Sequence, residues 1–140
     1  MEERWMALDV GSKRIGVAIS DPLGLIAQGI EVYQRKGGLE KDLAYLAELF
    51  RKYQAQRLLL GLPRHMDGRE GPEAQGIRKF GRLLGVRCGV EPVFWDERLT
   101  TTEAERTLVS ADLSRAKRRK VIDQVAAVIL LESFLRYRNT

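Results

Sequence analysis

The stretch MALDVGSKRIGVAISD, residues 6–21, decides the fold. Met6–Val10 is a short apolar run that one acid, Asp9, interrupts, and Ile15–Ile19 is a second apolar run. A tight turn of Gly, Ser, Lys and Arg joins the two runs, so we expect a β-hairpin over residues 4–20. A carboxylate inside an apolar strand is costly unless it is paired or binds a metal. Asp9 is therefore the first candidate metal ligand, and Gly11 nearby would let a backbone or a phosphate come close.

Further elements follow from the periodicity of the rest of the chain. A third strand is expected over residues 29–33. The patterns then predict, in order, a helix over 39–53, a buried parallel strand over 57–62, a polar loop over 63–72, a helix over 73–84, a strand over 86–95, a helix from a capping box at 100 to about 109, and a long helix over 117–137. The order β-β-β-α-β-α-β-α-α predicts an α/β fold with a mixed five-stranded sheet and helices on both faces.

The composition limits the classes of protein that the chain can belong to. Its 140 residues suit a single domain, residues 1–140, and a 44% hydrophobic fraction is ordinary for a globular protein. No apolar run reaches membrane-spanning length and the N-terminus has no signal-type segment, so we expect a cytoplasmic protein without a membrane partner. The single Cys88 excludes an internal disulfide. A net charge of +5 favours a polyanionic partner such as nucleic acid.

Acids stand at three places where acids are not expected. Asp9 interrupts the first strand, Glu97 with Asp96 beside it ends the last predicted strand, and Asp123 lies on the apolar side of the last helix. Carboxylates that converge from these elements would hold one or two Mg²⁺ or Mn²⁺ ions, which prefer oxygen ligands. Such ions support hydrolysis of phosphodiester bonds.

Each acid also has an ordinary interpretation, which fits it at least as well when it is taken alone. Asp9 could pair with Lys13 or Arg14 across the hairpin. Asp96 and Glu97 could form surface ion pairs or belong to a helix N-terminus, where acids are favoured. Asp123 could bond to the basic residues one turn earlier on its own helix. The occurrence of all three, on elements that can meet in one fold, favours the metal site.

Basic residues form two groups near these acids. Lys13 and Arg14 lie in the hairpin turn, and RAKRRK, residues 115–120, opens the last helix a few residues before Asp123. Positive charge at a helix N-terminus opposes the helix dipole, and a role in binding phosphate would explain it there. His65, the single histidine, could act as an acid or base, but a solvent-facing loop position is the simpler interpretation.

Four blocks of the sequence together resemble those of a known family. LDVGSKRIGVAISD, LLGLPRHMDGREG, WDERLTTTEAE and VIDQVAAVILLESFL look like the blocks of the YqgF/RuvX family, in the same order and spacing. The resemblance covers nearly the whole chain. Members of this family are bacterial RNase H-like proteins described as pre-16S ribosomal RNA nucleases and formerly as Holliday-junction resolvases. The chain departs from the family pattern at Arg64 and His65, where an Asn-containing loop is more usual.

The resemblance implies an RNase H-like nuclease domain that depends on a divalent metal. Asp9, Glu97 and Asp123 match the catalytic and metal-binding acids, and Asp96 matches a companion acid. The predicted contacts to nucleic acid are Lys13, Arg14, Arg64, Arg98, Arg115, Lys117, Arg118, Arg119 and Lys120.

The expected activity is hydrolysis of structured RNA with Mg²⁺ or Mn²⁺, in 5′-end processing of pre-16S ribosomal RNA, by a monomer or weak homodimer. The alternatives are a Holliday-junction resolvase and a ribosome-assembly factor that binds nucleic acid without cleaving it.

Overall fold

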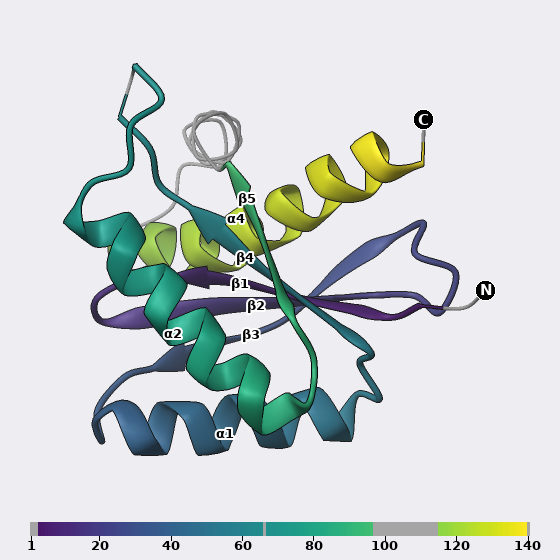
Figure 1. Ribbon diagram of the computed structural model, residues 1–140, viewed down its shortest axis with the longest axis horizontal. Coiled ribbons are helices and arrows are strands. Elements are labelled where there is room, and N and C mark those ends of the chain that lie inside the picture. Colours follow the sequence, from purple (N-terminus) through teal and green to yellow (C-terminus); the bar gives the residue numbers. More distant parts are fainter. Residues whose placement is uncertain (1–2, 66, 97–114, 140) are drawn as a thin grey trace.

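A computed structural model describes residues 3–65, 67–96 and 115–139, with the side chains of 115–123 outside that description (Figure 1). The described elements form one five-stranded sheet and three long helices. In chain order they are β1 (Trp5–Val10), β2 (Arg14–Ser20), β3 (Ala27–Gln34), α1 (Leu39–Lys52), β4 (Arg57–Leu62), α2 (Pro72–Cys88), β5 (Pro92–Asp96) and α4 (Arg115–Arg138).

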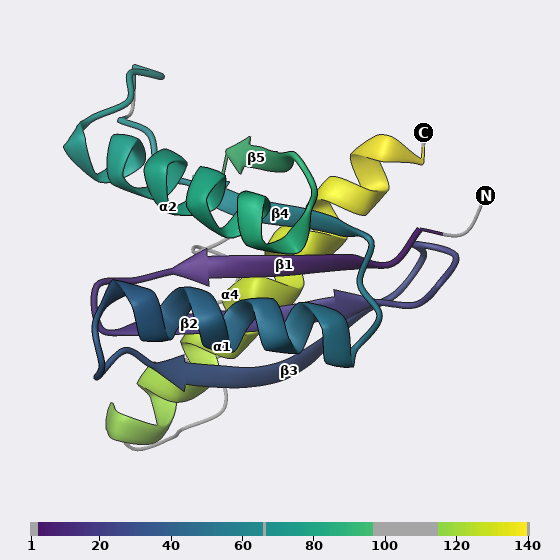
Figure 2. The same ribbon diagram turned by 60° about the horizontal axis from the view of Figure 1, so that its bottom comes forward.

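The sheet is mixed, and β1 lies at its centre. Its strand order is β3-β2-β1-β4-β5, with β1, β2 and β3 antiparallel in succession and β1, β4 and β5 parallel to one another. Helices α1 and α2 cover one face of this sheet and α4 crosses the other (Figures 1 and 2). The expected mixed sheet with helices on both faces is therefore confirmed.

Alternation along β1 divides the core into two layers. Met6 and Leu8 pack with the buried residues of α1 and α2, while Trp5 and Ala7 pack with Ala127 and other residues of α4. Because successive strand residues point to opposite faces, Asp9 belongs to the α4 side of the sheet.

The predicted boundary between the second helix and the last strand is wrong. Residues 86–88 continue α2, which ends at Gly89 with a φ of 75°, and β5 starts only at Pro92. Gly81 and Gly85 lie within the helix, and each is a place of close packing. A Cβ on Gly81 would lie 2.8 Å from the Phe94 ring, and one on Gly85 would lie 2.6 Å from the carbonyl oxygen of Val90.

Smaller differences concern two other elements. β3 runs over residues 27–34 rather than 29–33, and α4 begins at Arg115 rather than 117. The helix predicted over 100–109 lies outside the described residues.

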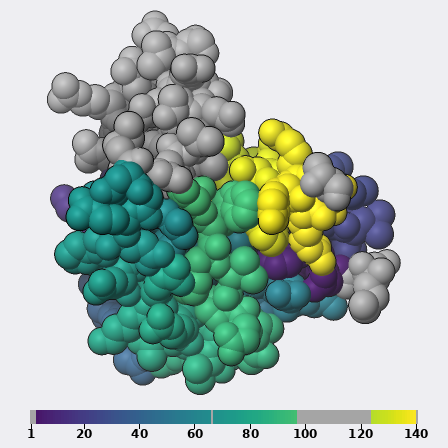
Figure 3. All heavy atoms as spheres, turned by 45° about the horizontal axis from the view of Figure 1, so that its top comes forward, coloured from purple at the N-terminus to yellow at the C-terminus, as the bar shows by residue number. Residues whose placement is uncertain are grey.

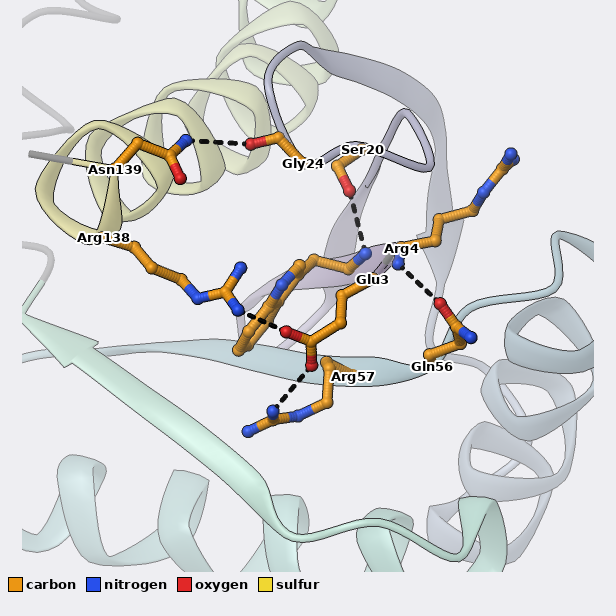
Figure 4. Close-up of polar contacts among 9 residues, drawn as sticks. Glu3, Arg4, Ser20, Gly24, Gln56, Arg57, Arg138 and Asn139 are labelled. Atoms are coloured by element: carbon orange, nitrogen blue, oxygen red, sulfur yellow. Dashed lines mark hydrogen bonds and ion pairs between the residues drawn. The ribbon is translucent and has the colours of Figure 1, made fainter. Parts of the chain in front are cut away.

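A cluster of polar contacts holds the molecule together at the N-terminal end of β1 (Figure 4). Glu3 accepts hydrogen bonds from Arg57, at 2.9 Å, and from Arg138 at the end of α4. Both guanidinium groups lie over the ring of Trp5, 4.7 and 5.2 Å from its centroid. These contacts fix the end of α4 against β1 and β4.

Candidate metal and nucleic-acid site

Asp9 lies near the C-terminal end of the central strand, partly buried on the α4 side. Its neighbour across β2 is Gly16. On the other side Leu8 pairs with Leu60 of β4, so the residue next in register to Asp9 is Gly61. Because neither glycine carries a side chain, both flanks of the Asp9 side chain are open within the sheet. A metal ion or a phosphate could approach the carboxylate there.

Several functional candidates meet at this end of the sheet. Strands β1, β4 and β5 all end there because they are parallel, and the turn between β1 and β2 lies there as well (Figure 2). Helix α4 also begins on this side, at the β3 edge, before crossing toward β4 and β5 (Figure 2). In open α/β sheets, ligands bind beyond the carboxyl ends of the strands.

Asp96 ends β5 but belongs to the other face of the sheet from Asp9. Val93 and Trp95 pack with the α4 layer, whereas Phe94 packs with the α1 and α2 layer. Alternation places Asp96 on the side of Phe94. The geometry therefore does not support Asp96 as a ligand shared with Asp9. Glu97, the following residue, lies outside the described residues.

Asp123 lies in the first half of α4, and its side chain is outside the description. Its surroundings are nevertheless informative. Gln124, the next residue, lies so close to Gly29 of β3 that a Cβ there would be 2.7 Å from the Gln124 amide nitrogen. One turn further, Ala127 is buried in the same cluster as Ala7, two residues before Asp9. This part of α4 is thus held against the face that carries Asp9.

The hairpin turn presents the first basic pair next to Asp9. The Gly11 N–H donates to the Arg14 carbonyl oxygen at 2.8 Å and closes the turn. Lys13 is exposed and forms no ion pair with any described residue, so its proposed pairing with Asp9 is not supported. Arg14 is partly buried at the start of β2.

The structure describes only some of the other basic residues that are predicted to contact nucleic acid. Arg64 is exposed beyond β4 and lies 3.7 Å from Glu70, which Arg78 also binds through two hydrogen bonds of 2.7 Å. Arg98 lies outside the described residues. The backbone of the basic run, residues 115–120, forms the first residues of α4, at the same end of the molecule as Asp9 (Figure 2).

His65 is exposed, as the simpler interpretation expected. The backbone N–H of His65 donates to the Arg69 carbonyl oxygen at 2.8 Å, and the His65 carbonyl oxygen accepts from the Gly68 N–H at 2.8 Å. A Cβ on Gly71 would lie 2.8 Å from the His65 Nε2 atom, so the imidazole ring lies against Gly71 at the end of the loop.

Sequence reasoning missed a buried acid that supports the hairpin turn. Asp42 of α1 is 2% exposed, accepts a hydrogen bond from the Tyr33 hydroxyl at 2.9 Å and pairs with the Arg35 Nε at 2.9 Å. Burial, and then the bond to Asp42, raises the pKa of Tyr33. Arg35 also donates to the Gly11 carbonyl oxygen at 2.7 Å, close to Asp9. The signal was available, because Asp42 falls on the same helical stripe as Leu39, Leu43 and Leu46.

Within residues 3–65, 67–96 and 124–139, no three acidic, histidine or cysteine side chains gather as a metal site. Two of the three predicted ligands, Glu97 and Asp123, have side chains outside those ranges. Asp9 thus lies between two glycine positions of the sheet, at the end that also carries the basic residues of the hairpin turn.

The chain is similar to known proteins over nearly its whole length. A family model described as "RuvX: Holliday junction resolvase" matches residues 3–137. A protein of Moorella thermoacetica named "Putative pre-16S rRNA nuclease" is 53% identical over 132 residues, which are 94% of this chain and 94% of that protein. One of the same name from Heliobacterium modesticaldum is 49% identical over 132 residues, 94% of this chain and 88% of that protein.

A solved structure gives independent support for the fold. RuvC of T. thermophilus in complex with a Holliday junction has a TM-score of 0.61 against this chain at 10% identity, covering 98% of this chain and 96% of RuvC. At so low an identity the likeness is one of fold, and it confirms the RNase H-like architecture. With the family model and the relatives at about half identity, it follows that the chain belongs to the RuvX family.

Proposed function

We propose that the protein is a divalent-metal-dependent nuclease that hydrolyses phosphodiester bonds in structured RNA, and that precursors of 16S ribosomal RNA are its substrate. The observation that carries this proposal is the position of Asp9. It lies on the central strand, between Gly16 and the register position of Gly61, at the end of the sheet where α4 begins with its basic run. The names of the relatives from Moorella and Heliobacterium support the choice of RNA.

The donor set fits a hard cation. Asp9, Glu97 and Asp123 would hold Mg²⁺ or Mn²⁺ through carboxylate oxygens, the ligands that both ions prefer. When bound, the ion supplies an activated water and stabilises the leaving oxygen. The open flanks of Asp9 leave room for a substrate phosphate beside its carboxylate.

The basic residues around this end would hold the substrate backbone. Exposed Lys13 in the turn and Arg64 beyond β4 are well placed for phosphate contacts, as is the start of α4 with its basic run. Contacts to phosphate position a nucleic acid without reading its sequence. They therefore suit a substrate that is recognised by its structure. No helix in the described part of the chain is long and apolar enough to cross a membrane, and we expect the enzyme to act in the cytoplasm as a monomer or weak homodimer.

A second candidate substrate is a four-way DNA junction. The description of the family model and the fold shared with RuvC favour it. A junction resolvase cuts two strands symmetrically and usually acts as a dimer.

The test offers purified protein a 5′-extended 16S precursor RNA and a four-way DNA junction, each with Mg²⁺, with Mn²⁺ and with EDTA. We expect metal-dependent cleavage of the RNA and none in EDTA. Cleavage of the junction alone would show that branched DNA, and not RNA, is the substrate. Binding of either nucleic acid without cleavage under every metal condition would contradict the proposal and favour an assembly factor.

A further inference from the structure

A pocket of about 420 Å³ opens between α1 and α2, beside the hairpin turn. Its volume falls within the roughly 300–1,000 Å³ of small-ligand sites. Val10, the residue after Asp9, forms part of its wall, together with Gly11 and Ser12 of the turn. Both helices begin at this end of the sheet (Figure 2). The pocket is thus a neighbour of the Asp9 site, on the other face of the sheet.

Apolar residues line most of the pocket. Ile77 and Phe80 of α2 are among them and are buried. Leu39 of α1 and Leu83 of α2 also line it and remain 45% and 37% exposed. An apolar surface of this kind, left open to water, suits a flat apolar ligand.

The polar groups of the lining suit a nucleotide. Lys79 forms no ion pair with any described residue, and Arg35 uses its Nε and Nη1 atoms for Asp42 and Gly11 while no described residue bonds to Nη2. Both can meet a phosphate. Glu73, the acid among the lining residues, can accept the N–H groups that bases carry on their edges.

A glycine of α2 keeps the pocket open. Glycine in a helix interior lowers its stability, and α2 contains three such residues. Close contacts explain Gly81 and Gly85, but a Cβ on Gly76 would have nothing within 4 Å of it. Gly76 lines the pocket. Packing within the described protein therefore does not account for this glycine, whereas room for a ligand does.

We propose that the pocket between α1 and α2 receives one unpaired nucleobase of a nucleic acid bound at the Asp9 end. Contact with Leu39, Leu83 and the other apolar lining side chains holds the base, while Lys79 and Arg35 meet its phosphate. The proposal rests on the proposed nuclease function and narrows it, because it requires an unpaired nucleotide near the bond that is cut.

The test fills the pocket without touching the Asp9 site. Gly76→Leu places a side chain in the open space, and Gln75→Leu adds the same side chain at the neighbouring exposed position of α2 as a matched control. Binding is measured in EDTA, where cleavage cannot occur, by fluorescence anisotropy. The probes are an RNA hairpin with one bulged adenosine, the same hairpin with an abasic bulge, and the fully paired hairpin.

We expect Gly76→Leu to bind the bulged hairpin about tenfold more weakly than the wild type, and Gln75→Leu to bind it equally well. The abasic bulge should weaken the wild type by the same factor and leave Gly76→Leu unchanged. Lys79→Gln should weaken binding of the bulged hairpin more than binding of the paired one. Circular dichroism checks that every variant is folded.

Other outcomes overturn the proposal. The proposal fails if Gly76→Leu and the wild type bind the bulged hairpin with equal affinity. It also fails if Gly76→Leu loses as much affinity for the paired hairpin as for the bulged one. Adenosine monophosphate that binds the wild type and not Gly76→Leu, with unchanged binding of the hairpins, would assign the pocket to a free nucleotide. Metal-dependent cleavage by the wild type is measured separately. Cleavage without the expected binding differences would refute the pocket proposal alone, and the expected binding differences without cleavage would refute the nuclease proposal alone.

Discussion

Asp42 shows what a single buried acid contributes in this protein. It joins Tyr33 at the end of β3 to Arg35 in the following loop, and Arg35 reaches the Gly11 carbonyl oxygen of the hairpin turn. The geometry of the turn beside Asp9 therefore depends on a residue of α1. Removal of a partner from a buried pair leaves the other charge uncompensated.

Asp42→Asn is expected to lower the free energy of unfolding by about 3 kcal/mol, because Arg35 loses its counter-charge in a mostly buried site. Urea denaturation measures this change. Glu48→Gln is the matched control, since the Glu48–Arg51 pair on the same helix is largely exposed and should contribute less than about 0.5 kcal/mol. Equal losses in the two variants would contradict the role given to Asp42.

Asp21 makes the connection between β2 and β3 sensitive to acid. Its carboxylate accepts backbone N–H groups of Ile26 and Leu25 at 2.7 Å each and of Leu23 at 3.2 Å. These bonds, with that from Ile26 as the largest cause, hold the pKa of Asp21 below its ordinary value of 3.8. A lowered pKa means that the folded state favours the charged form. The stabilisation is present above the ordinary pKa and is lost as the pH falls through the folded one.

Asp21→Asn should therefore be less stable than the wild type at about pH 7, and this difference should shrink as the pH falls below 3.8. Urea denaturation of both proteins across this range measures the change. The lowered pKa of Glu3 is common to both and cancels in the comparison. A difference that stays constant with pH would contradict the assignment.

Sequence patterns predicted some elements well, namely β1, β2 and α1, and failed at the end of α2. The two apolar runs of β1 and β2 and the helical stripe of α1 predicted those elements closely, because the signal lies within each segment. The end of α2 was misplaced because local patterns do not reveal why the helix contains Gly81 and Gly85. Phe94 packs against Gly81, and the Val90–Pro92 turn packs against Gly85. Asp42 was missed although its place on the apolar stripe of α1 was visible in the sequence. Only its partners, on β3 and in the loop after it, are beyond the reach of a local pattern.

Two alanine substitutions in α2 should have opposite effects on stability. Gly76→Ala should raise the free energy of unfolding by about 1 kcal/mol, because alanine favours the helix and its Cβ meets nothing. Gly81→Ala should lower it by about 1–3 kcal/mol, because its Cβ would lie 2.8 Å from the Phe94 ring. Thermal or urea unfolding measures both. A change of the same sign in the two variants would show that the contacts of α2 have been misjudged.

At the scale of the whole molecule, the two ends of the sheet differ. The N-terminal end of β1 is closed by Glu3, Arg57 and Arg138 around Trp5, and the opposite end carries Asp9, the turn and the start of α4 (Figures 2 and 4). Between α2 and α4, β5 reaches the surface of the molecule (Figure 3). The sequence predicted that Asp9, Glu97 and Asp123 lie on elements that can meet in one fold. The assignment of Asp96 to the opposite face rests instead on the packing of Phe94 and Trp95.

We propose that Asp9 and Asp123 belong to one metal site. Single-turnover cleavage of the precursor RNA in Mg²⁺ by Asp9→Asn, Asp123→Asn and the double variant tests this proposal, with Asp96→Asn as a comparison from the other face of the sheet. The effects of residues that act as a unit are not additive. We expect each single variant to lose at least about 10³-fold in rate, the double variant to be no slower than the slower single one, and Asp96→Asn to lose much less. Cleavage at the wild-type rate by folded Asp9→Asn, or losses that multiply in the double variant, would contradict a shared metal site.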